Sequence, residues 1–426
     1  MVAQQTVCLR RLASGARDEV VGFNRFFGNR RVTLERLIAG WSTEAQAACA
    51  GRHVLAIQDT SEFNFRTQEG RRRGLGEIGK GSGRGLLLHA MLGVDAESGA
   101  LLGLVSGKIW TREGRVETPH AQRNLADKES ARWLETAKAA KPLLARASLV
   151  TEISDRESDL YAKWAQVPGA AFHVLTRAMH DRPIAGGGKL SGARLAEADV
   201  AVVEALRTRP GRPARPAHLR VRYGQVELIR PKNTREKGLA RTVRVSLVEV
   251  VEIDPPDGAE PVHWRLLTTH EVGDVAMAWR VVGWYRQRWI IEQFFRTLKQ
   301  QGLQLEDSQV ETAERLMKLT AVAAKAAALI MQLVQARDGA TAQDAALAFS
   351  PPEIEAMTAL VPKLQGKTPL QKNPHPPASM AWAAWVVAKL GGWDGYPKSK
   401  PPGPITFRHG LQRFKSIARG WSLRDV

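Results

Sequence analysis

The sequence predicts an α/β fold with a functional site at the ends of buried strands. Short apolar runs typical of strands, residues 53–60 (HVLAIQDT) and 148–158 (SLVTEISDRES), alternate with segments of helical periodicity. Each of these two runs stops at an aspartate, Asp59 or Asp155. Ligands of α/β sheets bind beside the carboxyl ends of strands, so the two acids indicate where a site lies. Either acid alone is more often a turn or cap residue.

The first half of the chain is expected to form a helical segment followed by a mixed core. Residues 22–50 carry apolar residues at helical spacing, and Thr33 is placed to cap a helix that begins near Leu34. Three further elements are predicted before residue 180: a strand pair over 85–110, a helix over 125–140 and a strand over 171–178.

The second half is expected to contain a β-rich insertion followed by helices. Loop residues near Gly186–Gly188 and over 207–216 precede two alternating segments, 219–230 and 241–253. The strongest helix prediction spans residues 276–300. Three more helices are predicted, an Ala-rich one over 311–335, one over 380–390 and an amphipathic one over 407–421.

The charge balance predicts a polyanionic partner. The 426 residues include 62 Lys+Arg against 43 Asp+Glu, a formal charge of +19. Residues 207–244 alone hold 12 Lys+Arg and 2 Asp+Glu, which favours contact with phosphates. A membrane is the weaker alternative, because the longest apolar run, 319–334, contains Lys325 and is shorter than the roughly 20 residues of a spanning helix. We expect a buried helix there.

Cysteine and histidine usage predicts a reducing cytoplasm and a metal site made of carboxylates. Cys8 and Cys49 are too few for a disulfide framework, and residues 1–20 lack the apolar region of a signal peptide. No pair among the ten histidines has the spacing of a zinc site. Any bound metal is therefore expected to be held by Asp or Glu.

The helix predicted over residues 276–300 has two distinct faces. At about 100° per residue, four polar side chains fall within an arc of roughly 60°: Tyr285, Arg288, Glu292 and Lys299. The adjacent face is apolar and consists of Ile290, Ile291, Phe294, Phe295 and Leu298. The polar stripe suits a site that binds both metal and phosphate; the alternative is a solvated face with a weak Glu–Arg pair.

These motifs resemble those of the IS-four insertion-sequence family of bacterial cut-and-paste transposases. The shared features are a DDE triad of acids and a Y-(2)-R-(3)-E-(6)-K signature, which matches at every spacing. The segments that carry the resemblance, between about Gly22 and Trp421, are Gln58–Ser61, Asp155–Asp159, the Tyr285 to Lys299 series, Ala126–Ser130 with Trp133, Glu252–Pro256 and Trp264–Thr268.

The resemblance implies an RNase H-like catalytic core interrupted by a β-rich insertion. The implied regions are a helical N-terminal segment (1–52), the first part of the core (53–182), the insertion (183–270), the final core helices (271–335) and a helical C-terminal region that is expected to dimerise (336–426). It also implies that Asp59, Asp155 and Glu292 are catalytic and bind two Mg²⁺ ions, for which Mn²⁺ can substitute.

The implied reaction is excision and insertion of a DNA element. An activated water nicks the element's end, the freed 3′-OH forms a hairpin with the opposite strand, and the opened 3′ ends join target DNA. The expected partners are double-stranded DNA, as terminal inverted repeats and as target, and a second copy of the chain in a synaptic homodimer. Neither a membrane nor a nucleotide cofactor is expected.

Individual roles follow from the same resemblance. Tyr285, Arg288 and Lys299 are expected to hold phosphates, and Trp264 to stack on a flipped base. Taken alone, Trp264 is more typical of core packing. Two arginines are also expected to contact DNA, Arg177 and Arg296; by sequence alone, Arg177 is equally typical of a surface charge. Arg156 and Asp159 are expected to form a pair that orients Asp155.

Residues 74–80 (GLGEIGK) fit most of a phosphate-binding P-loop, but Gly81 stands where the motif needs a hydroxyl. We therefore reject a nucleotide site and expect a basic loop over residues 66–85 that is able to contact DNA.

About 21 residues precede the part that resembles the family, where relatives have several helices. Three explanations remain open: a compact end-recognition module, a start codon assigned too late, and a shortened form that inhibits by dimerising. The leading functional hypothesis is an active transposase, because a defunct copy tends to lose its acids and this sequence keeps all three. The alternatives are a non-catalytic, shortened derivative that binds DNA or inhibits by dimerising, and a plain RNase H-like nuclease.

Overall fold

The computed structural model describes residues 1–2, 4–65, 73–79, 83–114, 118–119, 122–197, 202–206, 215–258, 260–299, 302–337, 339, 343–396, 399 and 401–423. The chain divides into two compact units. The first unit comprises Met1–Arg52, Thr60–Arg115 and Ile290–Val426, and the second comprises His53–Asp59 and Val116–Trp289.

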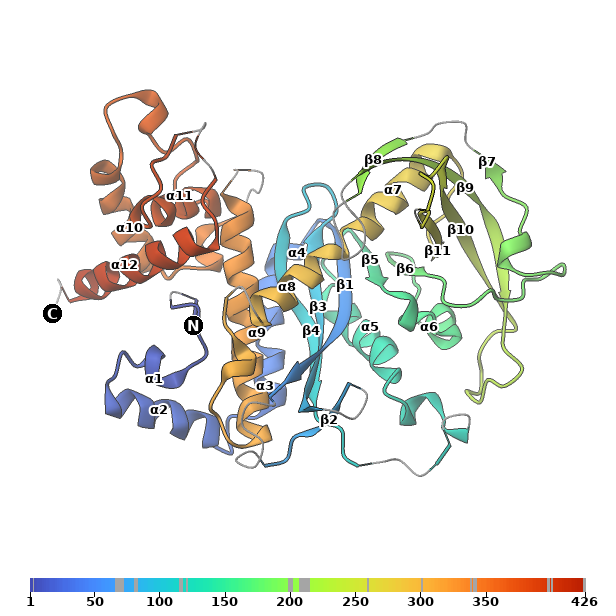
Figure 1. The fold of residues 1–426 in the computed structure, drawn as a ribbon, viewed down its shortest axis with the longest axis horizontal. Coiled ribbons are helices and arrows are strands. Elements are labelled where there is room, and N and C mark those ends of the chain that lie inside the picture. The colour runs from blue at the N-terminus through green and yellow to red at the C-terminus, as the bar shows by residue number, and fades with distance from the viewer. Residues whose placement is uncertain are drawn as a thin grey trace. The chain divides into compact units, whose positions relative to one another are not determined.

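The second unit is built on a mixed sheet (Figure 1). Starting from the first half of β1, the strand order is β1-β5-β6-β11-β10-β9-β7, and β8 also pairs with β9. The first three strands are parallel and the later pairings are antiparallel. The strands are β1 (His53–Asn64), β5 (Leu149–Ser154), β6 (Phe172–Arg177), β7 (Ala196–Glu197), β8 (Val202–Leu206), β9 (Arg215–Ile229), β10 (Thr242–Ile253) and β11 (His263–Thr268).

Helices cover both faces of the parallel strands. The helical elements of this unit are η3 (Leu125–Asp127), α5 (Ala131–Leu143), η4 (Arg156–Ser158), α6 (Tyr161–Gln166), η5 (Leu190–Gly192) and α7 (Val275–Arg286). Gln58 and Ser154 contact α5 and α6, whereas Trp284 of α7 packs against a histidine of β1. Because side chains alternate along a strand, Asp59 and Asp155 project toward the face that α7 covers.

The first unit surrounds the long helix α9 with strands and shorter helices. The second half of β1 continues into the order β1-β3-β2, and β4 pairs with β3. The remaining elements are α1 (Leu9–Leu12), α2 (Arg17–Gly28), α3 (Leu34–Ala39), α4 (Ser42–Cys49), β2 (Gly76–Ile78), β3 (Gly83–Asp95), β4 (Leu101–Trp110), α8 (Trp289–Lys299), η6 (Leu305–Asp307), α9 (Ala313–Ala336), η7 (Ala345–Leu347), α10 (Pro351–Leu364), η8 (Pro369–Gln371), α11 (Met380–Leu390) and α12 (Pro404–Ser422).

Helix α9 is the core helix of this unit. It packs against β4, α3 and α11, and its length and composition would also allow it to span a membrane. However, 72% of its most apolar window is buried inside the protein. The buried helix that the sequence predicted is therefore confirmed.

The C-terminal helices α10, α11 and α12 form a bundle around one apolar cluster that includes Trp382, Trp385, Phe407 and Phe414. The backbones of α11 and α12 lie close together, because a Cβ at Gly410 would meet the carbonyl oxygen of Val387 at 1.8 Å. Both the helix over 380–390 and the amphipathic helix over 407–421 are confirmed.

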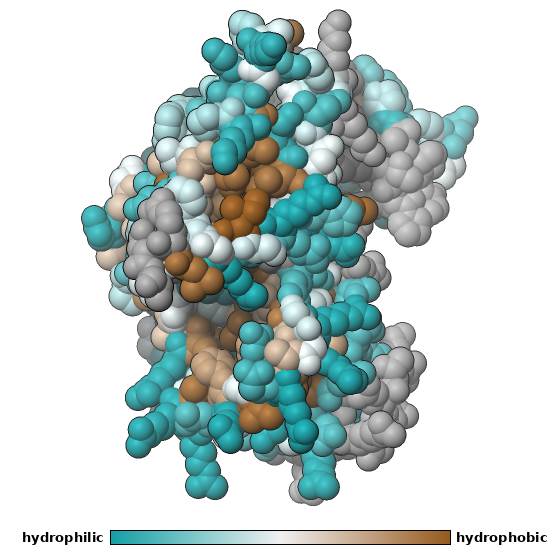
Figure 2. Space-filling view, turned by 90° about the vertical axis from the view of Figure 1, so that its left-hand side faces the viewer, coloured by the Kyte–Doolittle hydropathy of each residue, from teal (hydrophilic) through white to brown (hydrophobic). Residues whose placement is uncertain are grey.

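A cavity of about 1030 Å³ lies within the first unit, between residues 1–27, α9 and α12. Phe23, Phe26 and Phe27 line it together with Arg408 and other basic side chains. Figure 2, which views the left-hand side of Figure 1, shows apolar side chains gathered in a hollow. None of the described residues that line the cavity is a predicted site residue.

Most of the predicted elements are present. The cap is confirmed, because Thr33 Oγ1 accepts a hydrogen bond from the Arg36 N–H at the start of α3. Two predictions are wrong. The helix over 276–300 is divided into α7 and α8 by a turn at Gln287 and Arg288. Part of the expected loop over 66–85 is strand, β2 and the start of β3, while residues 66–72 and 80–82 lie outside the described residues.

A histidine cluster fills the end of the second unit's sheet that lies away from the aspartates. The Thr151 hydroxyl lies 2.8 Å from His53 Nε2 and 2.7 Å from His270 Nε2. The His173 ring stacks on the His270 ring, with ring centroids 3.9 Å apart. Burial, reinforced by the two neighbouring histidines, lowers the pKa of His270 to about 3. Folding therefore requires neutral His270.

This cluster predicts a pH-dependent stability. Between pH 6.5 and the folded-state pKa, the unfolded state binds the proton and the native state does not, so stability falls as the pH falls. We expect His270→Gln to remove about 3 kcal/mol of the stability difference between pH 7 and pH 4, measured by urea denaturation. His409→Gln, which removes an exposed imidazole from α12, is the control. An unchanged pH dependence in His270→Gln would contradict this assignment.

Candidate functional site

Asp59 forms an ion pair with Arg288 in the second unit. Arg288 Nη1 lies 2.8 Å from Asp59 Oδ2, and both side chains are mostly buried, with 14% and 18% of their surfaces exposed. Asp59 does not end β1, which continues to Asn64, but it lies just beyond Ile57, the last residue of β1 that pairs with β5. The predicted strand end at Asp59 is thus the end of a pairing rather than of a strand.

Asp155 directly follows β5 and begins the turn η4. Its Oδ1 accepts a 2.7 Å hydrogen bond from the backbone N–H of Arg156 and a long one, 3.5 Å, from the Tyr285 hydroxyl. Burial, and then the Asp155 carboxylate, raise the pKa of Tyr285 to about 12. Tyr285 is therefore a neutral phenol that can only donate its proton toward this carboxylate at ordinary pH.

Trp264 and Arg177 lie beside this pair on neighbouring strands. The Trp264 ring on β11 is half-buried and meets the Tyr285 ring edge-on, with centroids 6.2 Å apart. Arg177, at the end of β6, donates from Nη2 to the carbonyl oxygen of His263 at 3.2 Å. The second unit thus gathers an acid, a phenol, an indole and a guanidinium around the end of β5.

The expected pairing of Asp159 with Arg156 is wrong. The Asp159 carboxylate is buried and accepts hydrogen bonds from Arg182 Nε at 3.0 and 3.1 Å, Trp164 Nε1 at 3.0 Å and the Met179 N–H at 3.0 Å. The Arg156 side chain is exposed, and this residue reaches Asp155 through its backbone N–H alone among the bonds described above. Asp159 therefore anchors the loop after β6.

The remaining signature residues lie on α8, in the first unit. Glu292 is half-buried in the first turn, Arg296 is exposed, and the Lys299 ammonium lies 5.1 Å from the ring centre of Phe63. The predicted apolar face of this segment is confirmed, since all five of its members are buried: Ile290, Ile291, Phe294, Phe295 and Leu298.

The carboxylates supply the hard oxygen ligands that Mg²⁺ prefers. In this structure the Arg288 guanidinium places a positive charge beside Asp59, so a cation at Asp59 has to replace or join it. Within the part of the chain that the structure describes, no three His, Cys, Asp or Glu side chains form a group able to hold a metal ion. The donor chemistry fits Mg²⁺, whereas the grouping of three ligands stays a prediction.

Ion pairs neutralise much of the basic β insertion. The described arginines of this stretch that pair with glutamates are Arg215 with Glu252, Arg220 with Glu197, Arg222 with Glu249 and, at 4.0 Å, Arg244 with Glu227. Residues 207–214 lie outside the described residues. Because Glu252, Glu197 and Glu249 lie outside residues 207–244, the surface around these arginines is less positive than the count of 12 Lys+Arg against 2 Asp+Glu implies.

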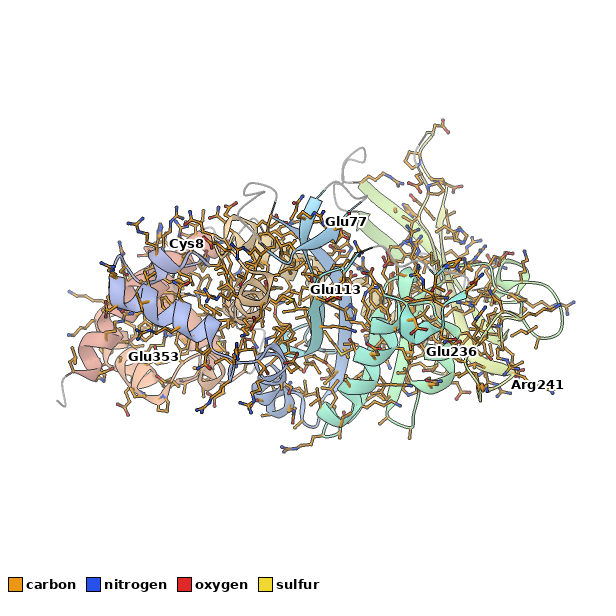
Figure 3. The ribbon with its side chains drawn as sticks, turned by 90° about the horizontal axis from the view of Figure 1, so that it is seen from below. Cys8, Glu77, Glu113, Glu236, Arg241 and Glu353 are labelled. Atoms are coloured by element: carbon orange, nitrogen blue, oxygen red, sulfur yellow. The ribbon has the colours of Figure 1, made fainter. Side chains whose placement is uncertain are left out.

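The turn between β9 and β10 keeps a more accessible charge. Lys232, Arg235, Lys237 and Arg241 are exposed there. Glu236, which Figure 3 labels together with Arg241, accepts a 2.9 Å hydrogen bond from the backbone N–H at the start of η3 and so fastens the turn to the body of the unit.

The structure contains a buried polar cluster around Lys163 that the sequence did not predict. Lys163 of α6 is fully buried, with Nζ 2.7 Å from Glu152 Oε2. The only available signal is that polar residues, Gln58 and Ser154, directly precede the two aspartates at positions that face the core.

Part of the chain matches a known protein family. Residues 211–329 match the model of the transposase DDE domain. The matched segment contains six of the predicted site residues, Trp264, Tyr285, Arg288, Glu292, Arg296 and Lys299. The match supports a DDE transposase, and hence an enzyme with a DNA substrate.

The Asp59–Arg288 pair predicts competition between this arginine and a metal cation. We expect Arg288→Ala to raise the Mn²⁺ affinity of the DNA-free protein by about tenfold, because it removes a positive charge that competes for Asp59. Calorimetric titration measures the affinity. Arg280→Ala, which removes an exposed arginine of α7, is the matched control. Equal Mn²⁺ affinity in wild type and Arg288→Ala would show that Asp59 is not a ligand.

Proposed function

We propose that this protein is a DNA transposase of the IS-four insertion-sequence family, similar to the transposon-five transposase. The observation that carries the proposal is the placement of two signature side chains against two acids: Arg288 on Asp59 and Tyr285 on Asp155. The match to the transposase DDE domain over residues 211–329 supports it independently. The mixed α/β architecture is compatible with an RNase H-like core that carries a β insertion.

The proposed catalytic acids are Asp59, Asp155 and Glu292. In this proposal their carboxylates hold two Mg²⁺ ions, which when bound activate the attacking water or 3′-OH and stabilise the leaving oxygen. Asp59 and Asp155 are contributed by neighbouring parallel strands, so the sheet itself sets their separation. Glu292 takes its role from the signature, four residues after Arg288.

The other signature residues are proposed to hold the DNA strand. Arg288 is able to contact two phosphate oxygens at once when it leaves Asp59, and Lys299 adds a second cation. Tyr285 remains protonated and donates a hydrogen bond, either to Asp155 or to a phosphate. Arg177 and Arg296 are proposed to contact the DNA backbone.

Trp264 is proposed to stack on an extruded base. Its half-buried ring stands next to Tyr285, so one part of the indole packs on protein while another part is accessible. A hairpin bends DNA sharply and unstacks a base, and an aromatic surface beside the acids would stabilise that base.

The proposed reaction has four steps that need no covalent protein intermediate. Water attacks a phosphodiester and releases a 3′-OH; this hydroxyl attacks the opposite strand and displaces another 3′ oxygen, which leaves a hairpin. Hydrolysis opens the hairpin, and the 3′ ends then attack target DNA. We propose that a homodimer in the bacterial cytoplasm performs these steps on paired DNA ends.

The proposal is tested with the DNA ends that flank the coding region, a plasmid target and Mg²⁺. We expect wild-type protein to nick the ends and to join pre-cut ends to the plasmid. Asp155→Asn and Glu292→Ala should lower nicking by at least about 10³-fold, because each removes a carboxylate at the reacting phosphate, while gel shifts show DNA binding close to wild type. Cleavage without joining would favour a plain nuclease, and binding without cleavage a non-catalytic derivative.

Trp264→Ala separates the steps. We expect it to slow hairpin formation about tenfold or more, because the extruded base loses its stacking surface, and to leave the first nick nearly unchanged. Gel analysis of single-turnover reactions measures both rates. Trp264→Phe keeps an aromatic surface and is the control. Equal slowing of nicking and hairpin formation would count against base stacking.

A further inference from the structure

One ammonium lies beneath the ends of three neighbouring strands. Lys163 Nζ is within hydrogen-bonding distance of Ser154 Oγ (2.5 Å), Ser158 Oγ (3.0 Å) and Thr176 Oγ1 (3.3 Å), and 2.7 Å from Glu152 Oε2. The other oxygen of Glu152 accepts a 2.6 Å hydrogen bond from Gln58 Nε2. The cluster thus joins β1, β5, β6, η4 and α6.

The members of the cluster have a common position in the sequence. Three of them immediately precede a proposed site residue: Gln58 precedes Asp59, Ser154 precedes Asp155, and Thr176 precedes Arg177. Because strand side chains alternate, each member faces the core while its successor faces the opposite side of the sheet. Any shift of a strand against the ammonium would therefore move the acid that follows.

Stability alone does not account for this arrangement. The Lys163 and Glu152 side chains are both 0% exposed, and removing two charges from water costs about as much as their attraction returns. In other proteins, replacing a buried ion pair by apolar side chains of similar size is often neutral for stability. The ion pair and its hydrogen bonds instead fix positions, because four oxygen atoms from β5, η4 and β6 must all lie close to the Lys163 nitrogen.

We infer that Lys163 is a positioning residue, which acts through Glu152, Gln58 and Ser154 to fix the spacing between the Asp59 and Asp155 carboxylates. This inference rests on the proposed function, in which those carboxylates share metal ions. Lys163 itself faces the other side of the sheet and contacts neither acid among the contacts described above. Its effect is therefore expected on metal affinity rather than on DNA binding.

The test compares Mn²⁺ binding by the full-length chain, followed by the electron paramagnetic resonance signal of free Mn²⁺. Lys163→Met alone would bury an unpaired carboxylate and is expected to lower stability. The decisive variant is therefore Lys163→Met/Glu152→Gln, which removes both charges and keeps an acceptor for Gln58. Lys318→Met is the matched control, because Lys318 is a buried, ion-paired lysine of α9 in the first unit. Thermal unfolding and gel shifts accompany each titration.

We expect the double variant to unfold cooperatively, to bind DNA like wild type and to bind Mn²⁺ at least about tenfold more weakly, with a matching rise in the Mn²⁺ concentration needed for nicking. Lys318→Met should lose stability and keep its Mn²⁺ affinity. Wild-type Mn²⁺ affinity in the double variant would overturn the positioning role.

The Asp155→Asn variant separates this inference from the proposed function. If Asp155→Asn weakens Mn²⁺ binding but the double variant does not, the positioning role alone is wrong. If Asp155→Asn binds Mn²⁺ like wild type, the acids are not ligands, and both proposals fall. A decrease in Mn²⁺ affinity in Lys318→Met equal to that in the double variant would also overturn the inference, because general loss of stability would then explain both.

Discussion

The central interaction of the second unit is the buried ion pair between Lys163 and Glu152. A fully buried ammonium in a medium of low polarity needs a counter-charge and hydrogen-bond acceptors, and the Lys163 side chain takes them from β5, β6 and η4. These contacts tie α6 to the ends of β5 and β6. The desolvation that lowers the pKa of Lys163 is opposed by Glu152, so the ammonium depends on that carboxylate. The opposite face of the same strands is thereby free to carry acids.

The two acids on that opposite face, Asp59 and Asp155, also have protein partners. Arg288 neutralises Asp59 and the Tyr285 phenol donates to Asp155, so neither carboxylate relies on solvent alone. The groups that do this belong to one short stretch at the end of α7. In the proposed function the same segment holds phosphates, so DNA binding would draw Arg288 and Tyr285 away from the acids to which they are bonded here.

Much of this could be predicted from the sequence, and the failures have definite causes. Within the predicted runs 148–158 and 171–178, Leu149–Ser154 and Phe172–Arg177 form β5 and β6, because short apolar runs with β-branched residues suit buried parallel strands. The division at Gln287 and Arg288 escaped prediction because the apolar spacing continues across the turn. The sequence pattern identified Asp59 and Asp155 as candidate site residues. It did not identify Arg182 as the partner of Asp159, because Arg182 is 23 residues away in a loop. The burial of Lys163 could not be predicted, because a lysine in a short helix is usually exposed.

The paired arginines of the β insertion change what the formal charge of +19 implies for DNA binding. Counterions condense on DNA and are released when a protein cation replaces them, and the number released sets how steeply affinity falls with salt. Arg215, Arg220 and Arg222 already carry protein counterions, the carboxylates of Glu252, Glu197 and Glu249. When such an arginine turns to a phosphate, its glutamate carboxylate stays nearby and repels the DNA, which reduces the net attraction. Among the residues of this stretch that the structure describes, the exposed lysines and arginines of the β9–β10 turn should therefore contribute more to the ionic-strength dependence of binding than Arg215, Arg220 and Arg222 do.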